Sequence, residues 1–197
     1  MFALPPVILG LLLANLAGFA LQWIAGDARW LTLALWPITM PGDAEFSFAP
    51  WQIVTYSLLH ANVAHLLFNM LGLVTFGAPL ERVGGARRML ILYFASVIAA
   101  ALTQLVVPPL FHAAAAPTIG ASGGVFGLLL AYAILFPHSR VLLLFPPIPM
   151  PAWLFALAYT VVELYLGVTG TQSGVAHFAH LGGMAGGAIV LWRWRRH

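Results

Sequence analysis

The sequence contains no cysteine and no lysine, and only five of its 197 residues are acidic. Without cysteine the chain can form no disulfide, no thiolate metal site and no cysteine nucleophile. Charged residues make up 7% of the chain and hydrophobic residues 62%, whereas a soluble domain is about a quarter charged. Together with a mean hydropathy of +0.97, this composition indicates a membrane protein.

Apolar runs bounded by proline, glycine and charge recur along the chain, with lengths close to the about 20 residues that a helix needs to cross a bilayer. They predict an all-α membrane protein with six transmembrane helices in a single domain, residues 1–197. The predicted helices are at about 5–24, 62–80, 88–107, 122–136, 151–168 and 176–192. The first run has no basic segment before it and no cleavage site after it, so we expect a retained span.

The fourth run is short. From Ser122 to Phe136 a helix rises roughly 22 Å, whereas the hydrocarbon core of a bilayer is about 30 Å thick. If the cytoplasmic end is fixed near Arg140, the start of this helix lies recessed below the external surface. Polar side chains at that depth would need a water-filled cavity between the outer halves of the helices.

All the basic residues are arginines, and they are distributed unevenly among the loops. An even number of spans places only Arg29 on one side of the membrane. The opposite side carries Arg82, Arg87, Arg88, Arg140, Arg193, Arg195 and Arg196. This asymmetry predicts that both termini are cytoplasmic, and it concerns orientation in the lipid bilayer, with no nucleic acid as a partner. The loop at about 25–61 is then external, and its tryptophans favour a folded segment at the interface, although simple packing on the helix ends explains them equally well.

One serine, Ser122, lies among glycines in the stretch GASGG at the start of the fourth run. The pattern GxSxG also marks the nucleophile of soluble α/β hydrolases, but that motif requires a preceding strand in a soluble sheet. Here both flanks are membrane-spanning runs, which excludes that fold. Gly123 and Gly127 form a row of small residues of the kind that lines helix contacts in membranes, so Ser122 alone also fits a packing role.

Two histidine-containing stretches favour a chemical role. HANVAHLLFNM places His65 and Asn69 four residues apart, on one face of the second helix. AHFAHLGGMAGG places His180 on the same face as Gly183 and Gly187 of the last helix. Polar side chains within spans are costly and usually face a cavity or each other. The glycines indicate close contact with a neighbouring helix; if that helix is the fourth, His180 reaches the serine.

These residues predict a dyad in which His180 activates Ser122, because a serine hydroxyl needs a base to become a nucleophile. We expect no acid to complete a triad, since three of the five acids lie in the external loop, one is cytoplasmic, and Glu163 lies near the outer end of the fifth helix. His65, Asn69 and the backbone N–H of Ser122 are the predicted donors to a developing oxyanion, where a helix N-terminus also favours negative charge.

The motifs resemble those of the rhomboid intramembrane serine proteases: HxxxxHxxxN in the second helix, GxSG in the fourth and AHxxGxxxG in the sixth. The resemblance covers almost the whole chain, as the minimal six-helix form of that family. It implies that Ser122 is the nucleophile, that His180 is the general base, and that His65 and Asn69 help to form the oxyanion hole, with no cofactor.

The resemblance further implies an endopeptidase that cleaves transmembrane helices of other membrane proteins near their external ends. The compact all-arginine chain favours a bacterial inner membrane, and loops rich in proline and glycine on both sides of the fifth helix make this helix the predicted gate for a substrate. One feature departs from the family pattern: many members have a Trp-Arg pair in the first loop, whereas Trp51 is followed by Gln52. This places one polar anchor of the loop in question.

Two other functions remain open. A metal or haem protein could use His60, His65, His177 and His180 as ligands from two helices, although it leaves the serine and the asparagine unexplained and has no HExxH signature. A catalytically inactive relative could bind transmembrane helices without cleaving them, but such relatives usually lose the serine or the histidine. We expect structural roles for His60 and His177, and for Glu163 a hydrogen bond to a neighbouring helix.

Overall fold

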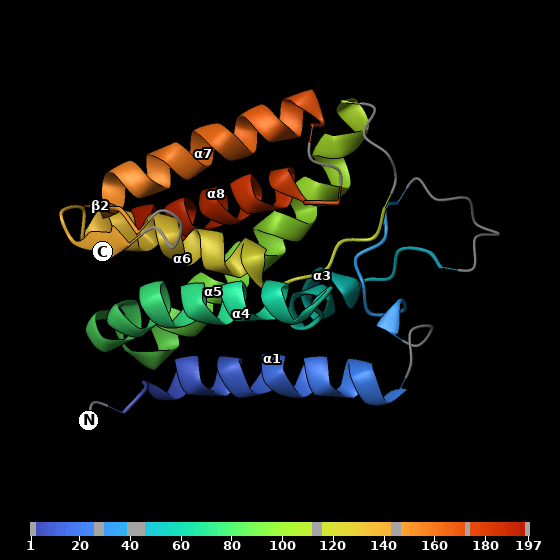
Figure 1. The fold of residues 1–197 in the computed structure, drawn as a ribbon, viewed down its shortest axis with the longest axis horizontal. Coiled ribbons are helices and arrows are strands. Elements are labelled where there is room, and N and C mark those ends of the chain that lie inside the picture. The colour runs from blue at the N-terminus through green and yellow to red at the C-terminus, as the bar shows by residue number, and fades with distance from the viewer. Residues whose placement is uncertain are drawn as a thin grey trace.

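The computed structural model describes residues 3–25, 30–38, 46–111, 116–142, 147–171 and 174–195, which form a bundle of long helices (Figure 1). The helices are α1 (Pro6–Ala25), α3 (Gln52–Thr55), the 3₁₀ helix η1 (Tyr56–Leu58), α4 (Val63–Gly72), the π-helix η2 (Leu73–Gly77), α5 (Ala78–Leu110), α6 (Ser122–Leu135), α7 (Ala152–Thr169) and α8 (His177–Trp194). The all-α membrane bundle predicted from the sequence is confirmed.

The six predicted helices agree with the observed ones to within a few residues. α4, η2 and the start of α5 form one continuous helical stretch, and α5 then breaks at Gly85, whose φ of 78° suits glycine because it has no Cβ. The described residues therefore contain six long helical stretches. Three segments are long and apolar enough to cross a membrane: Pro6–Ile24, Val63–Leu110, which includes the break, and Ala152–Thr169. Arg29 and Arg196, used in the topology prediction, lie outside the described residues.

A buried carboxylate fixes α1 to the rest of the bundle. Glu81 is 3% exposed, and its two oxygens accept the backbone N–H groups of Val7 and Ile8, each at 2.9 Å. The first N–H groups of a helix have no partner within the helix, and the positive end of the helix dipole favours an anion. This explains how an acid can be buried where α1 begins.

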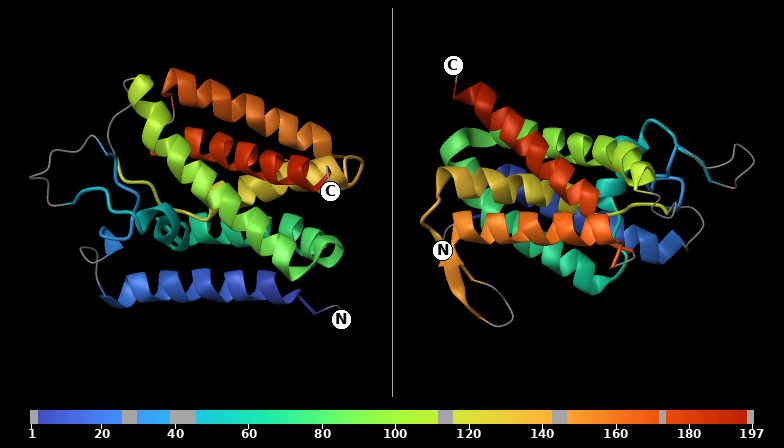
Figure 2. Two further views of the ribbon diagram at one scale, coloured as in Figure 1. Left: turned by 180° about the vertical axis from the view of Figure 1, so that it is seen from behind. Right: turned by 90° about the horizontal axis from the view of Figure 1, so that it is seen from above.

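The glycines of α6 and α8 bring these two helices into backbone contact, and Figures 1 and 2 show the helices side by side. A Cβ at Gly183 would collide with the backbone oxygen of Gly123, and one at Gly187 would lie 2.7 Å from the backbone oxygen of Gly127. No larger residue fits at these points. The tight contact expected from the glycine row is therefore present, and it is with the fourth long helix.

The described part of the external loop is folded around Gln52, which is 1% exposed. Its Oε1 accepts the backbone N–H of Trp36 at 3.1 Å, and its Nε2 donates to the backbone oxygens of Thr32 and Ser47, each also at 3.1 Å. Because one side chain joins the segment of Thr32 and Trp36 to that of Ser47, Gln52 is itself a polar anchor of this loop. The departure from the Trp-Arg pair thus leaves the loop anchored.

A small hairpin that the sequence did not predict connects α6 to α7. Its strands, β1 (Arg140–Leu142) and β2 (Pro149–Pro151), pair antiparallel with Val141 opposite Met150. The backbone N–H of Ala152, the first residue of α7, donates to the backbone oxygen of Ser139 at 2.9 Å. The hairpin thus ties the start of α7 to the end of α6.

Candidate active site

Ser122 is the first residue of α6, and the segment before it is held by backbone hydrogen bonds. Leu35 and Thr118 form an isolated antiparallel bridge with N–O distances of 2.9 and 3.0 Å, and the N–H of Gly120 donates to the backbone oxygen of Tyr56 at 2.9 Å. Gly120 has a φ of 127°, a conformation that other residues rarely adopt. The external loop therefore determines where the serine lies.

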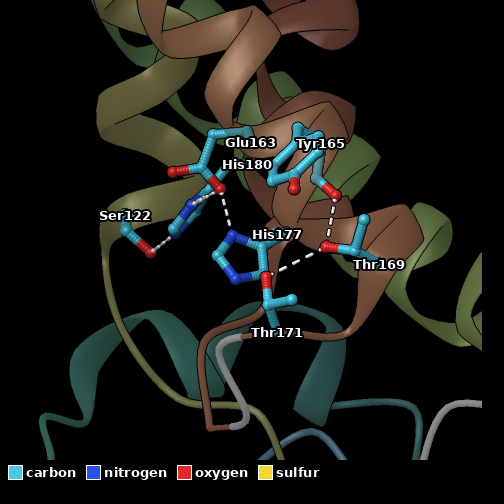
Figure 3. A network of polar contacts seen from close by, with 7 residues as sticks. All are labelled: Ser122, Glu163, Tyr165, Thr169, Thr171, His177 and His180. Carbon is cyan, nitrogen blue, oxygen red and sulfur yellow. Dashed lines mark hydrogen bonds and ion pairs between the residues drawn. The ribbon is translucent and has the colours of Figure 1, made fainter.

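The structure brings Ser122 and His180 together, as Figure 3 shows. The Nε2 atom of His180 lies 2.8 Å from the Oγ atom of Ser122, at hydrogen-bond distance. The imidazole also stacks on the ring of Phe126, with centroids 4.2 Å apart and planes 6° from parallel. Phe126 follows Ser122 by four residues, so both side chains lie on one face of α6. That spacing is the signal in the sequence that places Phe126 beside the serine.

The prediction that no acid lies near these two residues is wrong. The carboxylate of Glu163, on α7, is buried, and its Oε2 lies 2.9 Å from Nδ1 of His180. The same oxygen forms a hydrogen bond of 2.6 Å with Nδ1 of His177, so the expected bond from Glu163 to a neighbouring helix is present. The contact with His180 is short but lies off the N–H direction, so Nδ1 of His180 has no aligned hydrogen bond within the described residues.

The error had a simple cause. Glu163 lies in the second half of the fifth helix, as expected, but the serine and the histidine lie in the first turns of their helices, at the same end of the bundle. Helices joined by a short loop pack as antiparallel neighbours, so the last turns of α7 face the first turns of α8. The seven residues between Thr169 and His177 were therefore a sufficient signal.

The backbone around His65 determines which nitrogen carries its proton. Asn62 caps α4 by accepting the N–H of His65 at 2.8 Å. Nδ1 of His65 accepts the backbone N–H of Ala61 at 3.3 Å, so the neutral ring carries its proton on Nε2. A Cβ added to Gly120 would lie 2.8 Å from that Nε2. The ring thus presents a donor beside the segment that leads to Ser122.

Asn69 is buried one turn further along α4. Its Nδ2 donates to the backbone oxygen of His65 at 2.9 Å, which orients the amide. An amide nitrogen carries two hydrogens, so one more N–H is left to donate. Asn69 and His65 line the same cavity as Ser122 and His180, with the first N–H groups of α6 close by.

This cavity has a volume of about 1140 Å³ and lies among α4, α6, α7 and α8. Its polar groups cluster near the outer ends of the helices, and elsewhere its walls are largely apolar. The apolar part includes Phe68, Phe76, Leu129, Phe155 and Leu166. The volume is large enough for water and for an extended segment of another chain.

The four histidines of the metal hypothesis are not assembled into one group in the described part of the chain. His60 contacts His65, with ring centroids 5.1 Å apart, whereas Glu163, His177 and His180 form a separate cluster that has the donor atoms for a metal. In that cluster the N–O distances of 2.6 and 2.9 Å are hydrogen-bond distances. Two ligands on one tetrahedral zinc lie farther apart, roughly 3.3 Å, because each bond is about 2 Å long.

Fold and site together define a helical membrane bundle with a serine and a histidine in contact at the outer ends of two closely packed helices. The family model of the Rhomboid domain matches residues 47–197, and the chain belongs to the rhomboid family. It is an integral membrane protein of a family that includes intramembrane serine proteases.

Among similar proteins, Rhomboid protein 1, mitochondrial, of Saccharomyces cerevisiae is 37% identical over 142 residues, which cover 72% of this chain and 41% of the yeast protein. Putative rhomboid protease YdcA of Bacillus subtilis is 30% identical over 186 residues, covering 87% of this chain and 81% of YdcA. Rhomboid protease GluP of the same bacterium is 30% identical over 137 residues, covering 70% of this chain and 24% of GluP. The chain thus spans less than half the length of two of these three proteins.

Proposed function

We propose that this chain is an intramembrane serine endopeptidase that cleaves transmembrane helices of other membrane proteins near their external ends. The observation that carries this proposal is the 2.8 Å contact between Ser122 Oγ and His180 Nε2. Ser122 lies at the N-terminus of a helix, and both residues line a cavity inside a membrane bundle. Membership of the rhomboid family supports the same activity.

In this proposal a Ser122–His180 dyad carries out the covalent steps. Nε2 of His180 accepts the hydroxyl proton while Oγ attacks the scissile carbonyl carbon, and the carbonyl oxygen becomes an oxyanion. When the C–N bond breaks, the imidazolium returns the proton to the leaving amine. Water then attacks the acyl-enzyme with His180 again acting as base, which releases the new carboxylate and restores the serine.

The oxyanion would be stabilised by groups that are already in place. The backbone N–H of Ser122 is in the first turn of α6, where amides have no partner within the helix and the dipole favours negative charge. The Nε2–H of His65 and the second N–H of Asn69 are the side-chain donors. Such donors act because they are fixed before the charge develops.

Substrate would enter from the bilayer between α4 and α7, because the cavity extends along both helices. An intact helix shields its carbonyl groups, so the entering segment must unwind locally before attack. We further propose a single domain over residues 1–197, an orientation with both termini in the cytoplasm, and a bacterial inner membrane. The partners are then the lipid bilayer and transmembrane segments of substrates, with neither nucleic acid nor cofactor.

Serine-reactive labelling tests the proposal. Wild-type protein in liposomes should react with a fluorophosphonate and should cleave a co-reconstituted single-span substrate. Ser122→Ala should lose both reactions and His180→Ala should lose cleavage, with the unfolding temperatures close to that of the wild type. Full cleavage by Ser122→Ala would refute the proposal, whereas a folded wild type that neither reacts nor cleaves would point to an inactive helix-binding relative.

The oxyanion donors are tested separately. Loss of one such donor typically lowers turnover by about 10² to 10³. We therefore expect His65→Ala and Asn69→Ala each to reduce kcat by roughly that factor. The reduction should be larger for His65, because its ring also packs beside Gly120. Wild-type turnover in both variants would remove these residues from the mechanism.

A further inference from the structure

We propose that Glu163 is a positioning residue for the base: its carboxylate keeps the proton of the neutral His180 ring on Nδ1, and His177 holds that carboxylate in place. This inference rests on the proposed function, and it adds to the Ser122–His180 dyad two side chains that do not touch the reacting atoms. The set combines two helices, because the acid comes from α7 and both imidazoles come from α8 (Figure 3).

The contact between His177 and Glu163 has one plausible protonation. If Nδ1 of His177 carries the proton, it donates to Oε2 across 2.6 Å. Only an acceptor is then left without a partner, because Nε2 of His177 has none within the described residues. The opposite tautomer would bury an unsatisfied N–H and would place two lone pairs against each other at 2.6 Å, which costs free energy twice. His177 therefore anchors the carboxylate by donating to it.

The same reasoning applies to His180. Its Nε2 must be unprotonated to accept the proton of Ser122, so the neutral ring must carry its proton on Nδ1. Oε2 of Glu163 lies 2.9 Å from that atom and favours a hydrogen there, whereas a lone pair on Nδ1 would be repelled. The N–H and the oxygen are not aligned, but hydrogen bonds at catalytic sites often align only when substrate is bound.

The Glu163 carboxylate is buried, so it is stable there only while the two imidazoles contact it. Glu163 is 6% exposed, and His177 and His180 are 5% and 8% exposed. A buried carboxylate needs donors to offset the loss of hydration. In the described part of the chain, the contacts that serve this purpose are the two imidazoles, each through its Nδ1. When His180 becomes an imidazolium during the reaction, the adjacent carboxylate would stabilise the new positive charge.

Kinetics of four variants on α7 test the role of Glu163. Glu163→Ala removes the acceptor, and Glu163→Gln keeps the shape but can present an amide N–H to Nδ1 and so favour the wrong tautomer. In a soluble serine protease the equivalent change from acid to amide lowers kcat by about 10⁴. We expect both variants to lose at least about tenfold in kcat, with KM unchanged, and Glu163→Asp to recover part of the loss.

Thr160→Val is the matched control, because it removes a polar group one turn earlier on the same helix. Thr160 Oγ1 donates to the backbone oxygen of Ala156 and contacts Met184 of α8, away from the histidines. Its kcat should stay within about twofold of the wild type, as for substitutions that touch no reacting group. If Glu163→Ala fails to fold, the nearly isosteric Glu163→Gln decides the question.

A spectroscopic measurement separates positioning from a merely structural role. Nitrogen NMR of ¹⁵N-histidine-labelled protein distinguishes a protonated from an unprotonated ring nitrogen, and the His180 signals are assigned by their loss in His180→Ala. We expect the Nδ1–H tautomer in the wild type and in Thr160→Val, and its partial or complete loss in Glu163→Ala. Wild-type kcat together with an unchanged tautomer in the Glu163 variants would overturn the inference.

The two proposals fail differently. If Ser122→Ala keeps its activity, the proposed function is wrong and the role of Glu163 falls with it. If Ser122→Ala is inactive but Glu163→Ala and Glu163→Gln turn over as fast as the wild type, only the present inference is wrong. A rise in KM with unchanged kcat in those variants would likewise place Glu163 in substrate binding and overturn its role in orienting His180.

Discussion

The α6–α8 contact and the α7 helix supply different parts of one site, and they differ in how closely they pack against their neighbours. α6 and α8 touch through glycine backbones, at Gly183 against Gly123 and at Gly187 against Gly127. On α7 only four residues are buried, Ala152, Phe155, Ala156 and Glu163, and large apolar side chains face outward, among them Val161 at 58% exposed. The serine and the base are therefore carried by the tightly packed pair, whereas the acid is carried by the helix with fewer buried residues.

This difference suits the two tasks that an intramembrane protease must perform. The geometry between nucleophile and base has to be held closely, because a misplacement of about 1 Å can cost 10²-fold in rate. Backbone contacts between helices provide this stiffness, since neither helix has side chains there that can adjust. A substrate helix, in contrast, needs an entry route, and α7 contacts its neighbours through rings such as Phe126–Tyr159, which can rearrange.

The largest expected effect follows from a single methyl group in the stiff contact. Gly183→Ala would place a Cβ against the backbone oxygen of Gly123, where no side chain can move aside. We expect α6 and α8 to separate, with about 1–3 kcal/mol of lost stability from overpacking. Turnover should fall by about 10² or more, since Ser122 moves away from His180. Activity assays and thermal unfolding measure both effects.

Gly10→Ala is the matched control for this substitution. Gly10 lies in α1 just after its first turn, and a Cβ there meets nothing within 4 Å. Alanine in a helix interior is favoured over glycine by roughly 0.5–1 kcal/mol, so stability should stay the same or rise, with full activity. Equal losses in the two variants would contradict the proposed difference in packing.

The second prediction concerns the freedom of α7. Phe68 in the outer half of α4 and Leu166 in the outer half of α7 both line the cavity. Because the chain has no cysteine, Phe68→Cys combined with Leu166→Cys offers a unique pair of thiols for a reducible crosslinker. We expect the crosslink to suppress cleavage of membrane-embedded substrates at least about tenfold, and reductant to restore it, since entry requires local opening.

Each single-cysteine variant treated with the same reagent is the control for modification alone. Fluorophosphonate labelling should persist in the crosslinked protein, because a small probe needs no lateral entry. Undiminished cleavage with the crosslink shown to be complete would mean that substrate enters elsewhere.

The sequence predicted the α6–α8 part of the site better than the α7 part. Glycine spacing and the cost of polar groups in membranes were sufficient to predict that His180 meets Ser122, because both rules act within one helix and its direct neighbour. Glu163 was placed on the correct helix and at the correct end, but its partners depend on the rotation of α7 about its own axis. Apolar residues surround α7 almost evenly, so no pattern in the sequence indicates which face is buried.

The external loop shows the same limit. The family pattern led us to question its anchor at Gln52, since an amide differs from an arginine in charge. The structure shows that the amide satisfies three backbone groups at once. That outcome depends on contacts with residues up to 20 positions away, which no local rule describes. The position of Ser122 therefore also depends on the loop, because Leu35 of the loop pairs with Thr118 in the segment before the serine.

The third prediction tests that dependence. Gln52→Ala leaves the backbone N–H of Trp36 and the backbone oxygens of Thr32 and Ser47 without this partner. An unsatisfied buried group costs about 1–3 kcal/mol, so we expect a loss of stability in that range. Turnover at low temperature should fall only a few-fold, because the dyad itself is untouched. Gln22→Ala is the comparison variant: it removes the α1 amide that bonds to the backbone N–H and oxygen of His60, and we expect a smaller loss of stability. Equal stability of Gln52→Ala and wild type would show that the loop does not depend on this amide.

The smallest expected effect is a pH dependence of stability at the junction between the loop and α4. His60 is buried there, and burial, with the neighbouring His65 as a second cause, lowers the pKa of His60 from 6.5 to about 4. The unfolded chain therefore binds more protons between these two values than the folded chain does, so stability rises with pH across this window. His60 contributes its full stabilisation above about pH 6.5 and loses it progressively as the pH falls toward 4.

We expect the midpoint of thermal unfolding to fall between pH 7.5 and pH 5 in the wild type, and to fall less in His60→Gln, which cannot be protonated. If His60→Gln and wild type lose the same stability between the two pH values, the titrating group lies elsewhere. The junction between the loop and α4 is then as insensitive to protonation as the glycine contact between α6 and α8.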